Sequence, residues 1–134
     1  MVAIGFTVFK DKILTGEKTQ TIRPYSERRW KTILKNRKLQ LYWKLRTKEC
    51  EFLKEVNLKE MFKIRFEIKW LRLYSLGCYT FSKEEDGTWR EMEEEEMEDL
   101  ARRDGFESFK ALVEWFKGKY GVGIFTQDFM VIRW

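Results

Sequence analysis

The residues with the clearest chemical potential lie together in a short segment, residues 16–24, with the sequence Gly-Glu-Lys-Thr-Gln-Thr-Ile-Arg-Pro. It puts a lysine, two threonines, a glutamine and an arginine within six residues, just after a glycine. Outside a glycine-rich phosphate loop, such a cluster is typical of a segment that binds a polar or anionic ligand.

The same segment also suits the binding of a nucleotide. Lys18 and Arg23 can hold a phosphate, while Thr19, Gln20 and Thr21 can contact the polar edges of a base or a ribose. The simplest alternative is a solvated edge strand in which the arginine makes a surface ion pair. The binding hypothesis requires the lysine and the threonine to share one cleft.

The absence of histidine limits the chemistry that the chain can perform. It excludes Ser-His-Asp and Cys-His catalysis and every His-ligated metal site. Cys50 and Cys78 stand alone without Cys-x-x-Cys spacing. We therefore expect reduced thiols in a cytoplasmic protein, with no metal and no cofactor.

The elements around residues 16–24 decide whether these side chains meet. Residues 11–16 look like a helical turn that stops at Gly16, followed by a strand. In that strand Thr19, Thr21 and Arg23 should share one face and Gln20 the other. Lys18 can reach Thr21 only if it lies in the turn before regular strand geometry begins.

Two further segments alternate as strands do. In residues 39–46 apolar and polar positions alternate. The polar face would offer stacking and phosphate contacts through Tyr42, Lys44 and Arg46. Tyr42 also fits a half-exposed sheet residue. Residues 62–70 form a longer strand, and the alternation slips at Trp70 and continues to Leu73, which indicates a bulge.

The remaining periodicity indicates helices between strands. Residues 27–35 form a short helix with Trp30, Ile33 and Leu34 inward, and two helices are expected over 92–103 and 107–119. Asp86-Gly87 indicates a hairpin, and residues 125–134 a final strand. The fold class is α+β in a single domain, residues 1–134, with a small curved barrel of mixed strands and helices packed outside it.

Charge is unevenly distributed along the chain. Residues 1–83 hold 20 Lys and Arg against 8 Asp and Glu, whereas residues 84–134 hold 7 against 14. The basic residues 1–83 would attract phosphate backbones. A basic run would extend this surface, and it consists of Arg28, Arg29, Lys31, Lys35, Arg37 and Lys38. Equally, the acidic part can neutralise the basic part within one fold. The many Lys and Glu residues also suit a thermophile.

The first motif resembles that of the ASCH family, a branch of the PUA-like proteins, and notably its small archaeal members. Gly16, Lys18 and Arg23 match the family pattern Gly-x-Lys-x-x-x-x-Arg. The likeness continues through residues 39–48 and 104–109 and ends at 131–134. The resemblance implies a PUA-like barrel with a cleft at the first motif, and a partner that is RNA or a nucleotide.

The resemblance also implies an alternative activity, amide hydrolysis of N4-acetylcytidine, known in one small bacterial branch. Lys18 and Thr21 match two members of its catalytic set, which implies Thr21 as the nucleophile and Lys18 as its base. Lys18 can serve as a base only if burial or a neighbouring cation such as Arg23 lowers its pKa. The third member falls on Asp104, where that branch has a glutamate. Asp104 fits a helix N-cap better than a catalytic acid, although one residue can do both. A third possibility is an interaction module that uses the acidic residues 93–96. No apolar run is long enough for a membrane, and the choice between monomer and dimer stays open.

Overall fold

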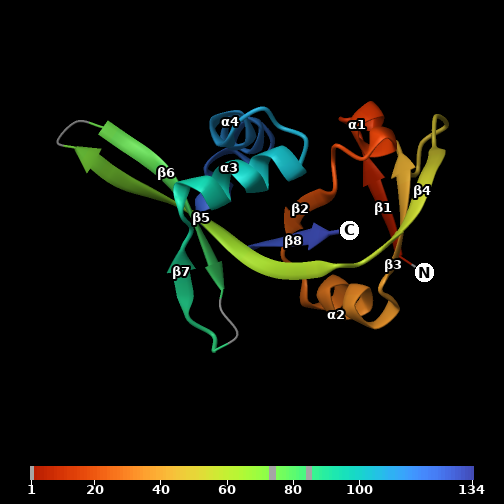
Figure 1. The fold of residues 1–134 in the computed structure, drawn as a ribbon, viewed down its shortest axis with the longest axis horizontal. Coiled ribbons are helices and arrows are strands. Elements are labelled where there is room, and N and C mark those ends of the chain that lie inside the picture. The colour runs from red at the N-terminus through yellow and green to blue at the C-terminus, as the bar shows by residue number, and fades with distance from the viewer. Residues whose placement is uncertain (1, 73–74, 84–85) are drawn as a thin grey trace.

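The computed structural model describes residues 2–72, 75–83 and 86–134, so Leu73, to which the alternation of the long strand was expected to continue, lies outside the described residues. The chain is a mixed α and β fold (Figure 1). Its elements in order are β1 (Val2–Phe6), α1 (Lys10–Thr15), β2 (Gln20–Pro24), α2 (Glu27–Asn36), β3 (Lys38–Trp43), β4 (Glu51–Asn57), β5 (Glu60–Arg72), β6 (Ser75–Lys83), β7 (Trp89–Glu91), α3 (Glu94–Arg103), α4 (Phe109–Tyr120), a 3-10 helix (Gly121–Phe125) and β8 (Phe129–Arg133).

The described strands form two sheets, in the orders β1-β3-β4 and β2-β8-β5-β6-β7. β1 pairs with β3 in parallel, whereas the other pairings are antiparallel. The α+β class is confirmed. Both sheets are open in the described part of the chain, so the expected closed barrel is not confirmed.

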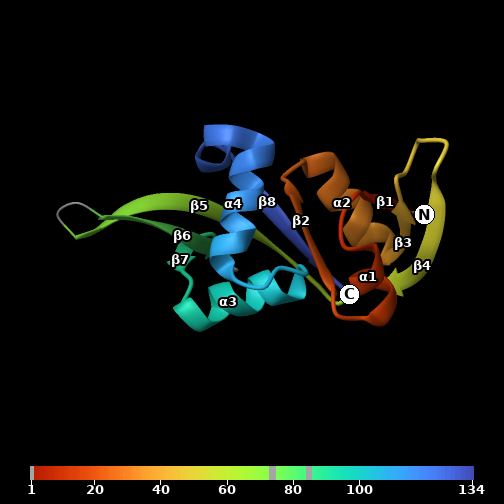
Figure 2. The same cartoon turned by 90° about the horizontal axis from the view of Figure 1, so that it is seen from above.

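Strand β8 lies between two hydrophobic cores. Phe129 and Val131 pack in a core with residues of α3 and α4, whereas Met130 and Ile132 pack in a core with residues of β1, β3, α1 and α2. Successive side chains of a strand point to opposite faces, so one strand can serve both cores. Figure 2 shows α3 and α4 on one side of β8 and β2, and the sheet of β1, β3 and β4 on the other.

Several local predictions are confirmed. Helix α1 ends at Gly16, whose φ of 86° is the left-handed conformation that glycine adopts readily. The alternating residues 62–70 lie within β5, and its pairing with β6 shifts register between Trp70 and Arg72. The turn at Asp86-Gly87 connects β6 to β7.

The expected strand over residues 39–46 was too long. β3 ends at Trp43, and Lys44 and Arg46 have φ values of 46° and 68°. The apolar alternation continued into this loop because Leu45 packs against Gly5, where an added Cβ would lie 2.7 Å from the Leu45 Cβ. Lys44 and Arg46 therefore belong to a loop and not to the polar face of a strand.

Two other details differ from the expectation. Leu34 is 41% exposed, whereas its neighbour Ile33 is fully buried. Adjacent residues on a helix are about 100° apart, so the narrow contact face of α2 includes one and not the other. The final strand begins at Phe129 because residues 121–125 form a 3-10 helix. None of the helices in the described residues combines the length and the apolar character needed to cross a bilayer.

Candidate functional site

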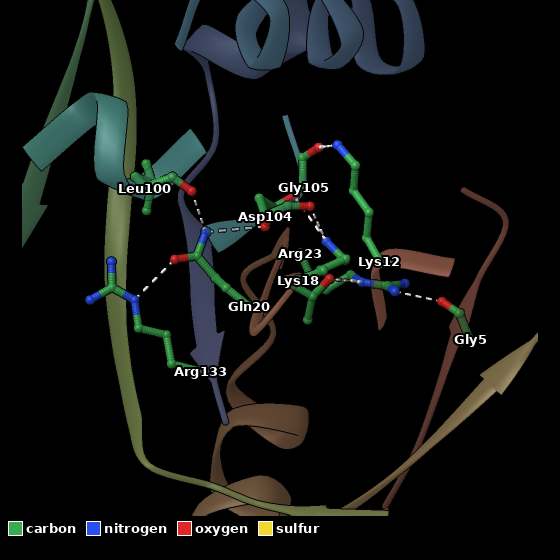
Figure 3. Close-up of polar contacts among 10 residues, drawn as sticks. Gly5, Lys12, Lys18, Gln20, Arg23, Leu100, Asp104, Gly105 and Arg133 are labelled. Carbon is green, nitrogen blue, oxygen red and sulfur yellow. Dashed lines mark hydrogen bonds and ion pairs between the residues drawn. The ribbon is translucent and has the colours of Figure 1, made fainter. Parts of the chain in front are cut away.

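The site is built around a buried ion pair between the turn before β2 and the end of α3. Lys18 is 2% exposed and Asp104 5%. The Lys18 ammonium donates to the Asp104 backbone oxygen at 2.5 Å and lies 3.3 Å from its carboxylate Oδ2 (Figure 3). Backbone bonds hold the turn, since the Lys18 amide donates to Lys12 and the Thr19 amide to Arg103, each at 2.9 Å.

The end of α3 explains why these side chains gather there. The last carbonyls of a helix lack intrahelical partners and carry partial negative charge. Three side chains donate to backbone carbonyls around this end: Gln20 to Leu100 at 2.9 Å, and Lys18 and Lys12 to Asp104 and Gly105 at 2.5 Å each. The segment after Gly16 is thus bound to the negative end of α3.

Asp104 is the C-cap of α3, so its assignment as an N-cap was wrong. The N-cap of α4 is Ser108, whose hydroxyl accepts from the Ala111 amide at 3.1 Å. The segment Asp-Gly-Phe-Glu has an N-cap spacing, but the helix begins four residues later and leaves the carboxylate free to meet Lys18. The aspartate therefore contributes to the site as a buried acid.

Gln20 orients Asp104 from the other side. Its side-chain oxygen accepts from Arg133 Nε at 2.9 Å, and Arg133 in turn contacts Glu60 at 3.1 Å. Because the oxygen is committed to Arg133, the amide nitrogen must face inward, where it donates to Asp104 Oδ1 at 3.1 Å. A polar chain thus runs from Glu60 through Arg133 and the buried Gln20 to the ion pair. Figure 3 shows this chain from Arg133 onward.

Arg23 and Thr21 form the second part of the site. Arg23 Nε donates to the Thr21 hydroxyl at 3.0 Å, and its Nη2 donates to the backbone oxygen of Gly5. The guanidinium lies 5.1 Å from the centre of the Phe6 ring, and the Lys18 ammonium lies 5.6 Å from the same ring. An aromatic ring attracts cations, so Phe6 helps to hold the ammonium and the guanidinium near each other.

These groups border a hollow of about 130 Å³ with aromatic walls. Its lining includes Lys18, Thr21, Arg23, Asp104, Lys119, Phe6, Phe9, Phe106 and Trp115. A wider groove of about 690 Å³ adjoins it and is lined mainly by the loop after β3. The groove includes Arg23, Arg29, Lys44, Arg46, Lys48 and Glu49. The two spaces share Gly5, Phe6, Thr7 and Arg23.

Burial dominates the electrostatics of the ion pair. It lowers the pKa of Lys18, and the charges of Arg23 and Lys12 lower it further, whereas Asp104 opposes the shift. Burial likewise raises the pKa of Asp104 against the opposing effects of Lys18 and Gln20. Both shifts favour the neutral forms, because charge is costly to bury. Burial and the charge of Arg23 also lower the pKa of Lys119.

The structure separates the residues expected from the sequence into three groups. Lys18, Thr21, Arg23 and Asp104 line the hollow, and Lys44 and Arg46 line the groove. The others are not among the residues that line either space: Thr19, Gln20 and Tyr42. Gln20 is fully buried in the polar chain, and the Tyr42 hydroxyl donates to Gln40 at 3.3 Å while its ring packs on Phe52.

The aromatic walls were missed by the sequence analysis. Phe9 precedes α1 with a φ of 64°, and its ring meets Phe106 edge-on at 5.0 Å. Gly105 leaves room for it, since an added Cβ there would lie 3.0 Å from the Phe9 ring. These contacts join residues far apart in sequence, so no local pattern indicated them.

No family model, curated protein or solved structure matches this chain. Within residues 2–72, 75–83 and 86–134, no three potential metal-ligating His, Cys, Asp or Glu side chains gather. The chemistry of the site therefore has to be argued from its own groups: an amine whose pKa burial lowers, a hydroxyl beside a guanidinium, a buried acid and aromatic walls.

Proposed function

We propose that the chain binds RNA or a nucleotide as a PUA-like protein of the ASCH type, with a base in the hollow. One observation carries the proposal: Lys18, Thr21 and Arg23, which the sequence places within six residues, line a single hollow with aromatic walls. Aromatic side chains stack on bases, and cations beside them contact phosphates. The resemblance of residues 16–23 to the ASCH pattern supports the same ligand class.

A binding titration against short RNAs tests this proposal. Phosphate contacts make affinity fall as salt rises from about 50 mM to about 200 mM. We expect Arg23→Gln to weaken binding and to reduce that salt dependence. The matched control is Lys31→Gln, because this lysine is exposed and pairs with Glu27 one turn away on α2. Binding that ignores salt, or that survives Arg23→Gln combined with Thr21→Val, would refute the proposal.

A second candidate is hydrolysis of an N4-acylated cytidine, which the burial of Lys18 beside Thr21 and Arg23 in the lining of the hollow favours. Burial lowers the pKa of Lys18, and the Asp104 carboxylate 3.3 Å away orients it. In this reaction the Thr21 oxygen attacks the amide carbonyl carbon while Lys18 takes the hydroxyl proton. Lys18 then returns the proton to the leaving amine nitrogen of cytidine, and water releases the acyl group from Thr21. Arg23, at 3.0 Å from the hydroxyl, stabilises the developing alkoxide.

The hydrolase candidate is tested with N4-acetylcytidine and two substitutions at one position. Thr21→Val removes the nucleophile but keeps the shape of the side chain, whereas Thr21→Ser keeps a hydroxyl. We expect release of acetate by the wild type and by Thr21→Ser, and none by Thr21→Val. Turnover that is absent from the wild type, or equal in all three proteins, would reject Thr21 as the nucleophile and leave only the binding function.

A further inference from the structure

We propose that the groove beside the hollow is a phosphate track, so that the ligand is a single-stranded polynucleotide and not a free nucleoside. This inference rests on the proposed function, because it takes the hollow as the place of a base. It concerns a different set of residues, those of the loop between β3 and β4 and of α2.

The first support is the continuity of the two spaces. Gly5, Phe6, Thr7 and Arg23 border both, and the groove is several times larger than the hollow, at about 690 Å³ against about 130 Å³. A base that fills the hollow leaves its sugar at this shared border. The chain of a longer ligand then has to continue into the groove, past the guanidinium of Arg23.

The second support is charge. Five cationic side chains line the groove against one anionic side chain, Glu49. Glu49 pairs with Lys44, which leaves the charges of Arg23, Arg29, Arg46 and Lys48 uncompensated within the groove. Neither Arg46 nor Lys48 has an ion-pair partner among the described residues. A series of phosphates is the ligand that such a row of cations neutralises best.

The third support is that the loop is preformed. The Lys44 amide donates to Phe6 at 2.8 Å, the Thr47 hydroxyl donates to Lys44 at 2.7 Å, and the Glu49 amide donates to Thr47 at 3.2 Å. Lys44 and Arg46 hold positive φ values, which cost a non-glycine residue about 1 kcal/mol or more. A loop that keeps its cations in a strained but well-bonded conformation loses little entropy when it binds a phosphate chain.

Two variants with the same loss of charge separate this groove from general attraction. Arg46→Gln/Lys48→Gln removes two cations of the groove. Lys110→Gln/Lys117→Gln removes two exposed cations of α4 that lie outside the lining of the groove. The probes are the four ribonucleosides and fluorescein-labelled RNA hexamers of each base, titrated at about 50 mM and about 200 mM salt.

We expect the wild type to bind hexamers at least about tenfold more tightly than the matching nucleosides. The groove variant should lose most of that gain, whereas its affinity for nucleosides should stay within about twofold of the wild-type value. Its slope of log hexamer affinity against log salt should be smaller by roughly 0.7 for each lost phosphate contact. The α4 variant should behave as the wild type.

Each contrary result has its own meaning. If the groove variant binds hexamers as tightly as the wild type while Thr21→Val weakens hexamer binding, the phosphate track is refuted and the proposed function stands. If poly-glutamate of matching length binds as tightly as the hexamers, the groove is a general anion surface and the inference is refuted. If the wild type binds neither nucleosides nor hexamers, the proposed function fails and the track fails with it.

Discussion

Lys18 and Asp104 form an ion pair at 3.3 Å although their side chains are only 3% and 7% exposed. The desolvation of two buried charges offsets most of their attraction, so such a pair adds little net stability. Its removal from one side only is a different matter, because the remaining charge is then buried without a partner. This asymmetry makes the pair experimentally informative.

Asp104→Asn should lower the free energy of unfolding by about 3–5 kcal/mol, because it leaves the Lys18 ammonium buried without a counter-ion. The matched control is Asp99→Asn on the same helix, where the exposed Asp99 pairs with Arg103 at 2.8 Å. That exposed pair should contribute about 0–1 kcal/mol. Urea denaturation of the three proteins measures both differences, and equal losses for the two variants would contradict a buried charge at Lys18.

Removal of both charges separates the structural role of the pair from its role in binding. Lys18→Met/Asp104→Leu replaces two buried ions with apolar side chains of similar size, a change that is often neutral or stabilising by about 1–4 kcal/mol. We expect the double variant to be at least as stable as Asp104→Asn but to bind no RNA hexamer. A stable double variant that retains wild-type affinity would show that the pair only fastens α3 to β2.

The stability of the protein should depend on pH through Lys18. Its folded pKa is below 10.5, so between that lowered value and 10.5 the unfolded chain binds more protons than the folded one. Stability from this group therefore rises as pH rises through that window. The contribution of Asp104 to this pH dependence has the opposite sign. Between pH 3.8 and its raised folded pKa the folded chain binds more protons than the unfolded one, so stability falls as pH rises.

Urea midpoints measured across the alkaline range for the wild type and for Lys18→Met isolate the lysine. The wild type should gain stability relative to Lys18→Met as pH increases through the window between the lowered pKa and 10.5, so its advantage over the variant should grow. Lys12→Gln should move this transition to higher pH, because the charge of Lys12 lowers the pKa of Lys18. A difference that is constant with pH would mean that burial does not change the protonation of Lys18.

Gly5→Ala should disturb the groove, because its Cβ would lie 2.7 Å from the Leu45 Cβ. We expect a loss of about 1–3 kcal/mol in unfolding free energy and weaker binding of hexamers, since the loop after β3 has to move. Gly118→Ala in α4 is the control with the opposite sign: nothing lies within 4 Å of its Cβ, and alanine should stabilise the helix by about 1 kcal/mol. Equal changes in unfolding free energy for Gly5→Ala and Gly118→Ala would contradict a steric clash between position 5 and Leu45.

Local patterns allowed much of the fold to be predicted, because α1, β5 and the hairpin at Asp86-Gly87 depend on periodicity and on turn residues close in sequence. The extent of β3 was not predictable in this way. Leu45 continues the alternation for a reason outside the strand, namely the space left by Gly5. Likewise Leu34 has the composition of a core residue, but α2 presents too narrow a face to include it.

In the candidate site, too, some features follow from the local sequence and others from packing between distant residues. Lys18, Thr21 and Arg23 lie on one short segment, so their types and spacing were visible in the sequence. The inward direction of the Gln20 amide depends on Arg133, and the walls of the hollow depend on Phe106 and Trp115 from distant parts of the chain. Such relationships exist only after the two cores have packed, and single-sequence reasoning cannot supply them.

The contact of Phe9 with Gly105 has a consequence for how the protein can vary during evolution. Phe9 occupies a left-handed conformation that costs a bulky residue roughly 1–2 kcal/mol, and Gly105 provides the space for its ring. A larger residue at position 105 would meet that ring and would also be strained, because Gly105 has a φ of 103°. Related sequences should therefore keep glycine at position 105, even where position 9 carries a smaller residue.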